Sequence, residues 1–161
     1  MKTPWLNSFV VKDLDENWDN TSSKPGVYII KCGKNISRAG GTDSLGILYI
    51  GKSLKLRNRL WQFWYCHHPA SGFLWKHPKV STSISGKALH NKTDVENYLG
   101  NLTVRVATPV KRKLIDNAER AVLYEYLFRF GELPPLNFSL PKRWKDAPSK
   151  SELLWASKGF L

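Results

Sequence analysis

Two short runs of β-branched and aromatic residues, separated by a glycine-rich segment, place the tightest constraint on how this chain can fold. The runs are Val27-Tyr28-Ile29-Ile30 and Ile47-Leu48-Tyr49-Ile50, and both are typical of buried strands. Residues 33–46 between them contain Gly40-Gly41 and are expected to form a loop. Strands that a loop alone connects pair most simply in the antiparallel direction. We therefore expect a sheet built on this pair, with residues 102–107 as a third, alternating strand.

Two helical patterns accompany the strands. Residues 54–65 follow Ser53, a good N-cap residue, and carry Leu56, Leu60 and Phe63 on one stripe. Residues 110–130 form the longest helical pattern, which Gly131 and two prolines end. The resulting order, β-β-α-β-α, predicts an α/β fold of the α+β sandwich kind.

The length of 161 residues suits one compact domain. We expect a lead-in over 1–24 that is irregular or weakly helical, the domain itself over 25–138, and a basic tail over 139–161 that packs on the domain or extends it. No apolar run approaches the roughly 18 residues of a membrane span. The first residues carry neither a basic start nor a long apolar stretch, so we expect no signal peptide and a cytoplasmic protein.

Charge is distributed unevenly along the chain. The 25 Lys and Arg against 13 Asp and Glu give a net charge of +12, yet residues 1–24 hold three Lys and four acidic residues. The remaining 137 residues therefore carry a net charge of +13. A folded domain with that excess attracts polyanions, and nucleic acid is the first partner to expect. Binding to RNA or to an anionic membrane surface would rest on this charge alone.

Candidate chemistry gathers where the first two strands meet. Tyr28 opens one strand and Tyr49 lies in the other, so their side chains can share one face of the sheet. A glycine beside each tyrosine would leave room for a polymer to approach the backbone. Lys52 follows the second strand, and Arg57 and Arg59 follow on the first turns of the helix. Side chains two residues apart on a helix point to nearly opposite faces, so at most one of these arginines can face the tyrosines.

The long helix contributes a carboxylate, Glu119. Carboxylate oxygen is the ligand that a hard divalent cation such as Mg²⁺ prefers. In a domain this basic, a glutamate is more often an ion-pair partner than a metal ligand.

These elements together resemble the GIY-YIG nuclease family. The resemblance covers about residues 25–138, and residues 49–60 are especially similar to the incision subunit of bacterial nucleotide excision repair and to intron-encoded homing endonucleases. The matching elements, in order, are Gly26-Val27-Tyr28, Tyr49-Ile50-Gly51, Arg59, Glu119, and Asn137 after Pro134-Pro135.

The resemblance implies a three-stranded antiparallel sheet flanked by helices, and a DNA endonuclease with one divalent cation, Mg²⁺ or Mn²⁺, and no small-molecule cofactor. By analogy with the family, Tyr28, helped by Tyr49 and Lys52, would orient or deprotonate the attacking water. Arg59 would stabilise the transition state and Glu119 would bind the metal. A phenol with a pKa near 10 is a poor base at pH 7, so that role needs the pKa of Tyr28 to be lowered. The candidate substrate-binding residues are Lys55, Arg57, His67, His68 and Asn137, and for Asn137 we expect mainly a role in fixing the loop.

Several positions depart from the family pattern. Phe63 stands where many members have His or Tyr, and His67 and His68 can either substitute in space or be ordinary loop residues. The spacing to Asn137 favours Glu125 as the metal ligand, whereas the apolar residues three and four positions on favour Glu119. The hairpin between the two tyrosines is longer than is usual, which indicates an insertion. Trp61, Trp64 and Trp75 are expected to anchor the core and the loops; the alternative that one or two of them stack on exposed bases is not decided by the sequence.

The alternative function is a DNA-binding module with the same fold and no turnover. The complete Tyr, Tyr, Arg and Glu set argues against it, because a binding module does not need the carboxylate. Target specificity would come from the hairpin insertion, residues 67–100, the tail or an accessory partner protein.

Overall fold

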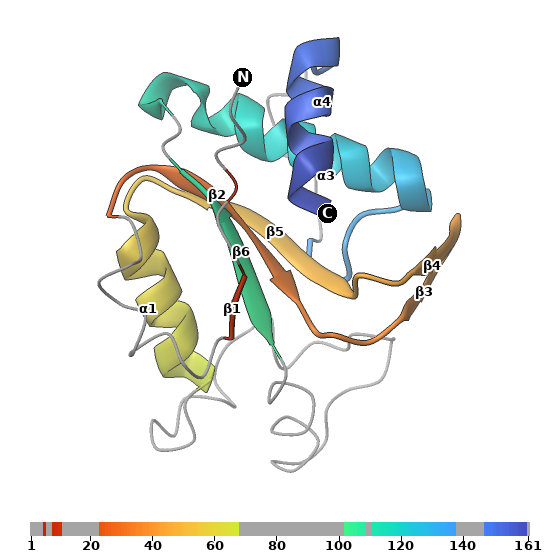
Figure 1. Cartoon of the computed structure of the whole chain (residues 1–161), viewed down its shortest axis with the longest axis horizontal. Coiled ribbons are helices and arrows are strands. Elements are labelled where there is room, and N and C mark those ends of the chain that lie inside the picture. The colour runs from red at the N-terminus through yellow and green to blue at the C-terminus, as the bar shows by residue number, and fades with distance from the viewer. Residues whose placement is uncertain are drawn as a thin grey trace.

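A computed structural model describes residues 5, 8–10, 23–67, 102–108, 111–137 and 147–160, with the side chains of 62–67 excepted. The described chain forms two sheets and three α-helices (Figure 1). The strands are β1 (Phe9–Val10), β2 (Gly26–Lys31), β3 (Ile36–Arg38), β4 (Gly41–Asp43), β5 (Ile47–Ser53) and β6 (Thr103–Ala107). The helices are α1 (Leu56–His67), α3 (Ile115–Phe130) and α4 (Lys150–Ser157), with 3₁₀ turns η4 (Arg112–Leu114) and η5 (Lys158–Phe160).

The main sheet has four strands in the order β1-β6-β2-β5, and every pairing is antiparallel. The antiparallel pairing of β2 with β5 is confirmed, but the expected number of three strands is wrong. The fourth strand, β1, comes from the lead-in and pairs Phe9 with Val104 and Val10 with Thr103. A two-residue strand has no periodicity to read, and it forms because the edge of β6 offers unpaired backbone groups.

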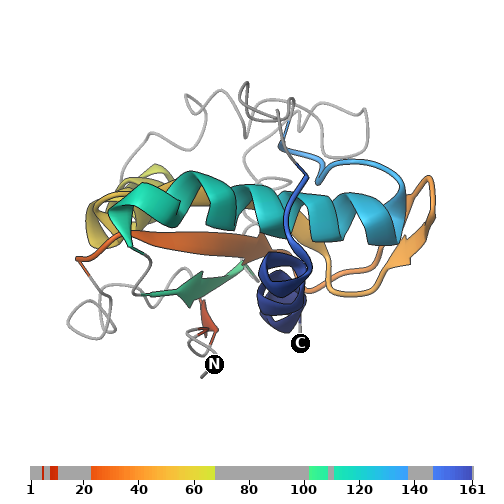
Figure 2. The same cartoon turned by 90° about the horizontal axis from the view of Figure 1, so that it is seen from above.

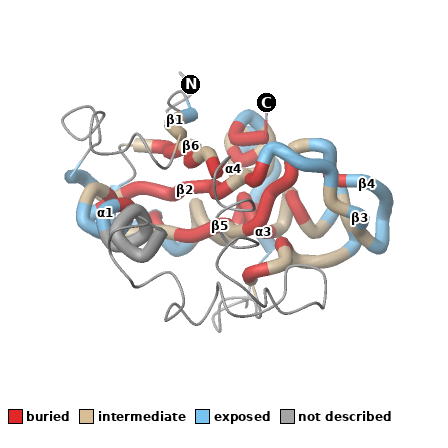
Figure 3. Tube along the Cα trace, turned by 90° about the horizontal axis from the view of Figure 1, so that it is seen from below, coloured by how far each residue is buried: buried red, intermediate tan, exposed pale blue. Residues whose placement is uncertain are grey.

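The helices cover both faces of this sheet, with α1 on one side and α3 and α4 on the other (Figure 1), which confirms the mixed α/β class. Figure 2 shows the long helix α3 from above. Leu56 and Leu60 of α1 pack on one face with Tyr28, Ile30 and Val106. The opposite face is covered by α3 and α4. Its core members include Val27, Ile29, Ile50, Ala121, Val122, Tyr126, Ala156 and Phe160. Burial is accordingly concentrated along β2 and α3 (Figure 3).

The segment expected to be a loop between the first two strands contains a small hairpin, β3–β4, anchored to the end of α3. The Gly40 N–H donates to the Phe130 carbonyl at 2.8 Å, and the Ala39 N–H donates to Glu132 Oε1 at 2.8 Å. Buried Asp43 accepts hydrogen bonds from the backbone N–H groups of residues 45–47 and from the Tyr126 hydroxyl. The insertion therefore lies at the end of the molecule opposite α1 (Figure 1).

Both terminal segments contribute to the core. Trp5 bridges to Ala107 of β6, and its ring centroid lies 5.4 Å from that of Trp155 in α4. Ser149 and Glu152 form a capping box at the start of α4, and Phe160 is buried. The described part of the tail therefore packs on the domain.

Two helix starts differ from the expectation. The first helix begins at Leu56, because the Ser53 hydroxyl accepts the Lys55 N–H at 3.1 Å in a turn before it. The long helix begins with η4 and becomes α-helical only at Ile115; its end at Gly131, with φ of 73°, is as expected. In the described residues, no helix has both the length and the apolar character that crossing a membrane requires.

Candidate active site

Tyr28, Tyr49 and Arg59 meet on the face of the sheet that α1 covers. In the register of β2 and β5, Tyr28 lies opposite Gly51 and Ile30 lies opposite Tyr49. The two tyrosines are therefore diagonal neighbours on one face, and their ring centroids are 5.9 Å apart. From α1, the Nε–H of Arg59 donates to the Tyr28 hydroxyl oxygen at 3.1 Å. Three separate elements thus bring together residues that are far apart in the sequence.

Gly51 makes this contact between the tyrosines possible. A Cβ at position 51 would lie 2.7 Å from Cζ and Oη of Tyr28 and 2.7 Å from Cε1 of Tyr49. The space beside this glycine is therefore taken by the two phenols, and the expected room for a polymer is not present there. Gly26 is equally enclosed, since its Cβ would lie 2.7 Å from the Ala107 carbonyl oxygen.

The protonation state of Tyr28 differs from the sequence expectation. Burial raises the pKa of Tyr28, the neighbouring Tyr49 raises it further, and Arg59 opposes this only in part. The pKa of the phenol thus lies above its ordinary value, whereas a general base at neutral pH would need a lowered one. Tyr28 is therefore a neutral hydroxyl that accepts a hydrogen bond from Arg59 and shares another with Tyr49.

A second cluster lies on the opposite face at the same end of β5. Lys52 Nζ is 2.6 Å from Oε2 of Glu119 and 2.7 Å from Oδ1 of Asp116, and both carboxylates come from α3. The Glu119 side chain is 12% exposed, so this ion pair is largely shielded from solvent, whereas Asp116 is 73% exposed. Burial alone would lower the pKa of Lys52, but the hydrogen bonds and charges of Asp116 and Glu119 raise it overall. Lys52 is thus held as an ammonium ion.

The two clusters are joined through consecutive residues. Gly51 packs against Tyr28 on one face, and the next residue, Lys52, reaches α3 on the other. Both positions pair with the start of β2, since Gly51 faces Tyr28 and Lys52 faces Val27 in the register. The end of β5 therefore has a tyrosine–arginine pair on one side and a lysine–carboxylate group on the other.

Asn137 is used to fix the chain rather than to present a polar group. Its Oδ1 accepts the Ile50 N–H at 2.9 Å, and its Nδ2 donates to the Ile50 carbonyl at 2.8 Å. The neighbouring Leu136 N–H donates to the Leu48 carbonyl at 2.9 Å. The segment after α3 therefore covers part of the outer edge of β5, which is the loop-fixing role expected for Asn137.

The other expected site residues differ in their positions and partners. Glu125 accepts from Arg129 Nε at 2.8 Å, one turn further along the same helix, while Glu119 reaches the end of β5. Lys55 is exposed and Arg57 is half-buried. The side chain of His67 and the whole of His68 lie outside the described residues, as do the side chain of Trp64 and the whole of Trp75.

One residue of this site, Asp116, was not singled out from the sequence. Asp116 lies three residues before Glu119, a spacing that puts both on one helix face, and that spacing was the available signal. Trp61 was expected to be an anchor of the core or a loop, but its side chain is 42% exposed.

The carboxylates of Asp116 and Glu119 are a donor set that fits a hard divalent cation. Mg²⁺ commonly binds through one or two carboxylates and completes its shell with water and phosphate oxygen. Both carboxylates already hold one cation, the Lys52 ammonium, between them. Within the described ranges, no group of three or more His, Cys, Asp and Glu side chains forms a ready metal cage.

Comparison with known proteins identifies no relative. No family model matches the chain, no curated protein is similar to it, and no solved structure resembles it.

Proposed function

We propose that this protein is a metal-dependent endonuclease that hydrolyses phosphodiester bonds in DNA with a site of the GIY-YIG type. The observation that carries the proposal is the hydrogen bond from Arg59 to Tyr28, at the end of β5 whose opposite face carries the Lys52–Glu119 ion pair. An arginine that stabilises phosphate charge and a carboxylate pair that can hold a metal ion are groups that phosphodiester hydrolysis uses.

The charge of the chain supports a nucleic-acid substrate. The net charge is +12, and Lys55, Arg57 and Arg59 lie close together along α1 and the turn before it. Arg59 is exposed while its Nε is held by Tyr28, so its guanidinium can contact a phosphate from a fixed position.

In this mechanism Arg59 stabilises the negative charge that develops on the phosphate as water attacks phosphorus. Tyr28, which is buried, holds the Arg59 guanidinium in position and takes no proton. As the bond from the water oxygen to phosphorus forms, the bond from phosphorus to the leaving oxygen breaks, and the proton that the water loses passes through solvent to the leaving oxygen. Gly51 keeps Tyr28 and Tyr49 in place. A divalent cation held by Glu119 and Asp116 would supply Lewis-acid stabilisation of the leaving oxygen. Lys52 must release these carboxylates before they can serve as metal ligands.

One observation favours the second candidate function, a DNA-binding module without turnover. The Lys52 ammonium lies 2.6 Å from Glu119, so this carboxylate already has a cation as its partner without a metal. If Lys52 stays there, the same surface binds DNA and does not cut it.

Plasmid cleavage separates the two functions. The full chain is incubated with supercoiled DNA in Mg²⁺, in Mn²⁺ and in an excess of chelator. The endonuclease nicks or linearises the plasmid only with the metal present. A chain that retards the DNA in a gel and leaves it supercoiled in all three conditions is the binding module.

A further inference from the structure

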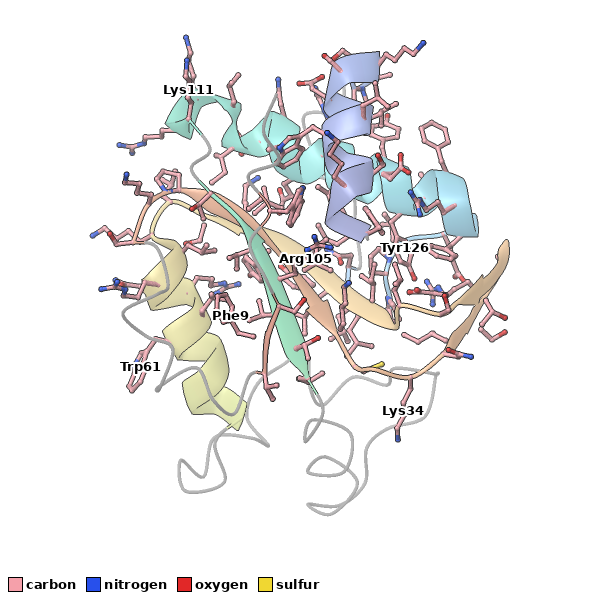
Figure 4. All side chains as sticks on the ribbon, in the orientation of Figure 1. Phe9, Lys34, Trp61, Arg105, Lys111 and Tyr126 are labelled. Atoms are coloured by element: carbon pink, nitrogen blue, oxygen red, sulfur yellow. The ribbon has the colours of Figure 1, made fainter. Side chains whose placement is uncertain are left out.

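An exposed tryptophan lies on the outer side of α1. Trp61 is 42% exposed, and its side chain points away from the sheet (Figure 4). Leu54, seven residues earlier, is 45% exposed. Leu54 lies in the turn that precedes α1, and Trp61 lies in the second turn of the helix. A large aromatic ring exposed on a basic helix points to a contact with another molecule.

The charge around Trp61 identifies the class of that molecule. Arg57 lies four residues before Trp61 and therefore on the adjoining turn of the same surface. Lys55 lies in the turn before α1, Arg59 lies on the far side of the helix toward Tyr28, and α1 itself contains no Asp or Glu. An aromatic ring next to a cation, on a basic helix with no anion, matches a nucleic-acid strand, whose phosphates pair with cations while its bases stack on aromatic rings.

We propose that the outer face of α1 at Arg57 and Trp61 binds an unpaired nucleotide of the substrate, with its base stacked on Trp61 and a phosphate held by Arg57. An unpaired base is required, because the faces of bases inside a duplex are covered by their neighbours. The inference deepens the proposed endonuclease function by naming its substrate as DNA with a single-stranded segment next to the cleaved bond.

The position of Trp61 relative to the candidate active site supports this arrangement. Arg59 and Trp61 are two residues apart, which corresponds to about 200° around the helix and about 3 Å along its axis. Arg59 faces Tyr28, while Trp61 faces outward. A strand crossing the exposed ridge at Asn58 would therefore contact Trp61 on one side of α1 and reach the Tyr28–Arg59 pair on the other.

The test measures binding, so that it does not depend on cleavage. Fluorescence anisotropy in Ca²⁺ compares the full chain on a blunt duplex and on a duplex of equal phosphate number with a single-stranded flap. We expect the flap to bind about tenfold more tightly, which is the scale of one stacked base. Trp61→Ala should abolish that difference, and Trp61→Phe should restore most of it.

A matched control comes from the other side of the molecule. Phe128 of α3 is 69% exposed, so Phe128→Ala removes an exposed aromatic ring from a different helix, on the opposite face of the sheet from α1. This variant should keep the full preference for the flap. Equal affinity of the unmodified chain for both DNAs would overturn the inference, as would a preference that survives in Trp61→Ala. Self-association that Trp61→Ala abolishes would also overturn it, since a second copy would then cover this face. If the chain prefers the flap but does not cleave DNA, the proposed endonuclease function is wrong, while the proposed nucleotide site on α1 is supported.

Discussion

The ammonium nitrogen of Lys52 lies 2.6 Å from Oε2 of Glu119. Lys52, which follows Gly51 in β5, therefore forms a direct ion pair with the long helix α3. Asp116 holds the same ammonium at 2.7 Å. If a divalent cation binds to these carboxylates, it competes with a cation that belongs to the protein. Lys52 would then limit the metal affinity of the site.

Removing the internal cation should therefore strengthen metal binding. We expect Lys52→Gln to bind Mn²⁺ at least tenfold more tightly than the unmodified chain, because the two carboxylates lose their competing ammonium. Titration followed by electron paramagnetic resonance measures this without DNA. Lys55→Gln removes an equal charge from an exposed position and should leave the affinity unchanged. Equal Mn²⁺ affinity in Lys52→Gln and the unmodified chain would show that these carboxylates do not hold the metal.

Arg59 and Arg57 should differ in what they contribute. Arg59→Ala removes the charge held by Tyr28, so the single-turnover cleavage rate should fall by roughly 10² or more, as it does when a preorganised donor is lost. Arg57→Ala should mainly weaken DNA affinity, with the rate at saturating protein nearly unchanged. Rapid-quench measurements at saturation distinguish the two effects. A larger loss of rate in Arg57→Ala would contradict the assignment.

Gly51→Ala should damage the site from inside the sheet. The added Cβ would lie 2.7 Å from both phenols, so Tyr28 and Tyr49 must move apart. We expect a loss of stability of about 1–3 kcal/mol, typical of overpacking, together with a loss of cleavage while DNA binding persists. Urea denaturation and anisotropy measure the two parts. Ser53→Ala, on the same strand but outside the tyrosine contact, is the control and should retain cleavage.

The raised pKa of Tyr28 predicts a particular pH dependence. Because burial keeps the phenol neutral, Tyr28 stabilises the fold below the ordinary tyrosine pKa of about 10. That stabilisation should be lost as pH rises toward the higher folded-state value. Between pH 6 and 9, Tyr28→Phe should cleave more slowly but with the same pH profile as the unmodified chain. If the cleavage rate of the unmodified chain rises with pH near neutrality and that of Tyr28→Phe does not, Tyr28 acts as a base and the assignment is wrong.

The sequence predicted the elements with strong local signals. The β-branched runs around Tyr28 and Tyr49 predicted β2 and β5, and helical spacing indicated that only one of Arg57 and Arg59 could face the tyrosines. The strand β1 could not be predicted, because two residues carry no pattern and its pairing depends on the edge of β6. The exposure of Trp61 was predictable in principle, since it lies about 100° beyond Leu60 on the helix and so outside the buried stripe.

Properties of the site that arise from tertiary packing could not be predicted from the sequence. The direction of the pKa shift of Tyr28 depends on burial beneath α1, which no motif encodes. Asp116 resembled an ordinary acidic residue in the first turn of a helix, where negative charge is favourable. Its role becomes visible only because α3 crosses the end of β5 and brings Lys52 to it.

The most direct test of the account is plasmid nicking by Glu119→Gln and Glu125→Gln, each over a Mg²⁺ titration with parallel DNA-binding measurements. Glu119→Gln keeps the size of the side chain and removes the charge that would hold the cation, so we predict no cleavage and DNA affinity that is equal or slightly higher. Glu125 is paired with Arg129 away from β5, so Glu125→Gln should keep most of the activity. Cleavage by Glu119→Gln at the rate of the unmodified chain would contradict the proposed metal site and the mechanism built on it.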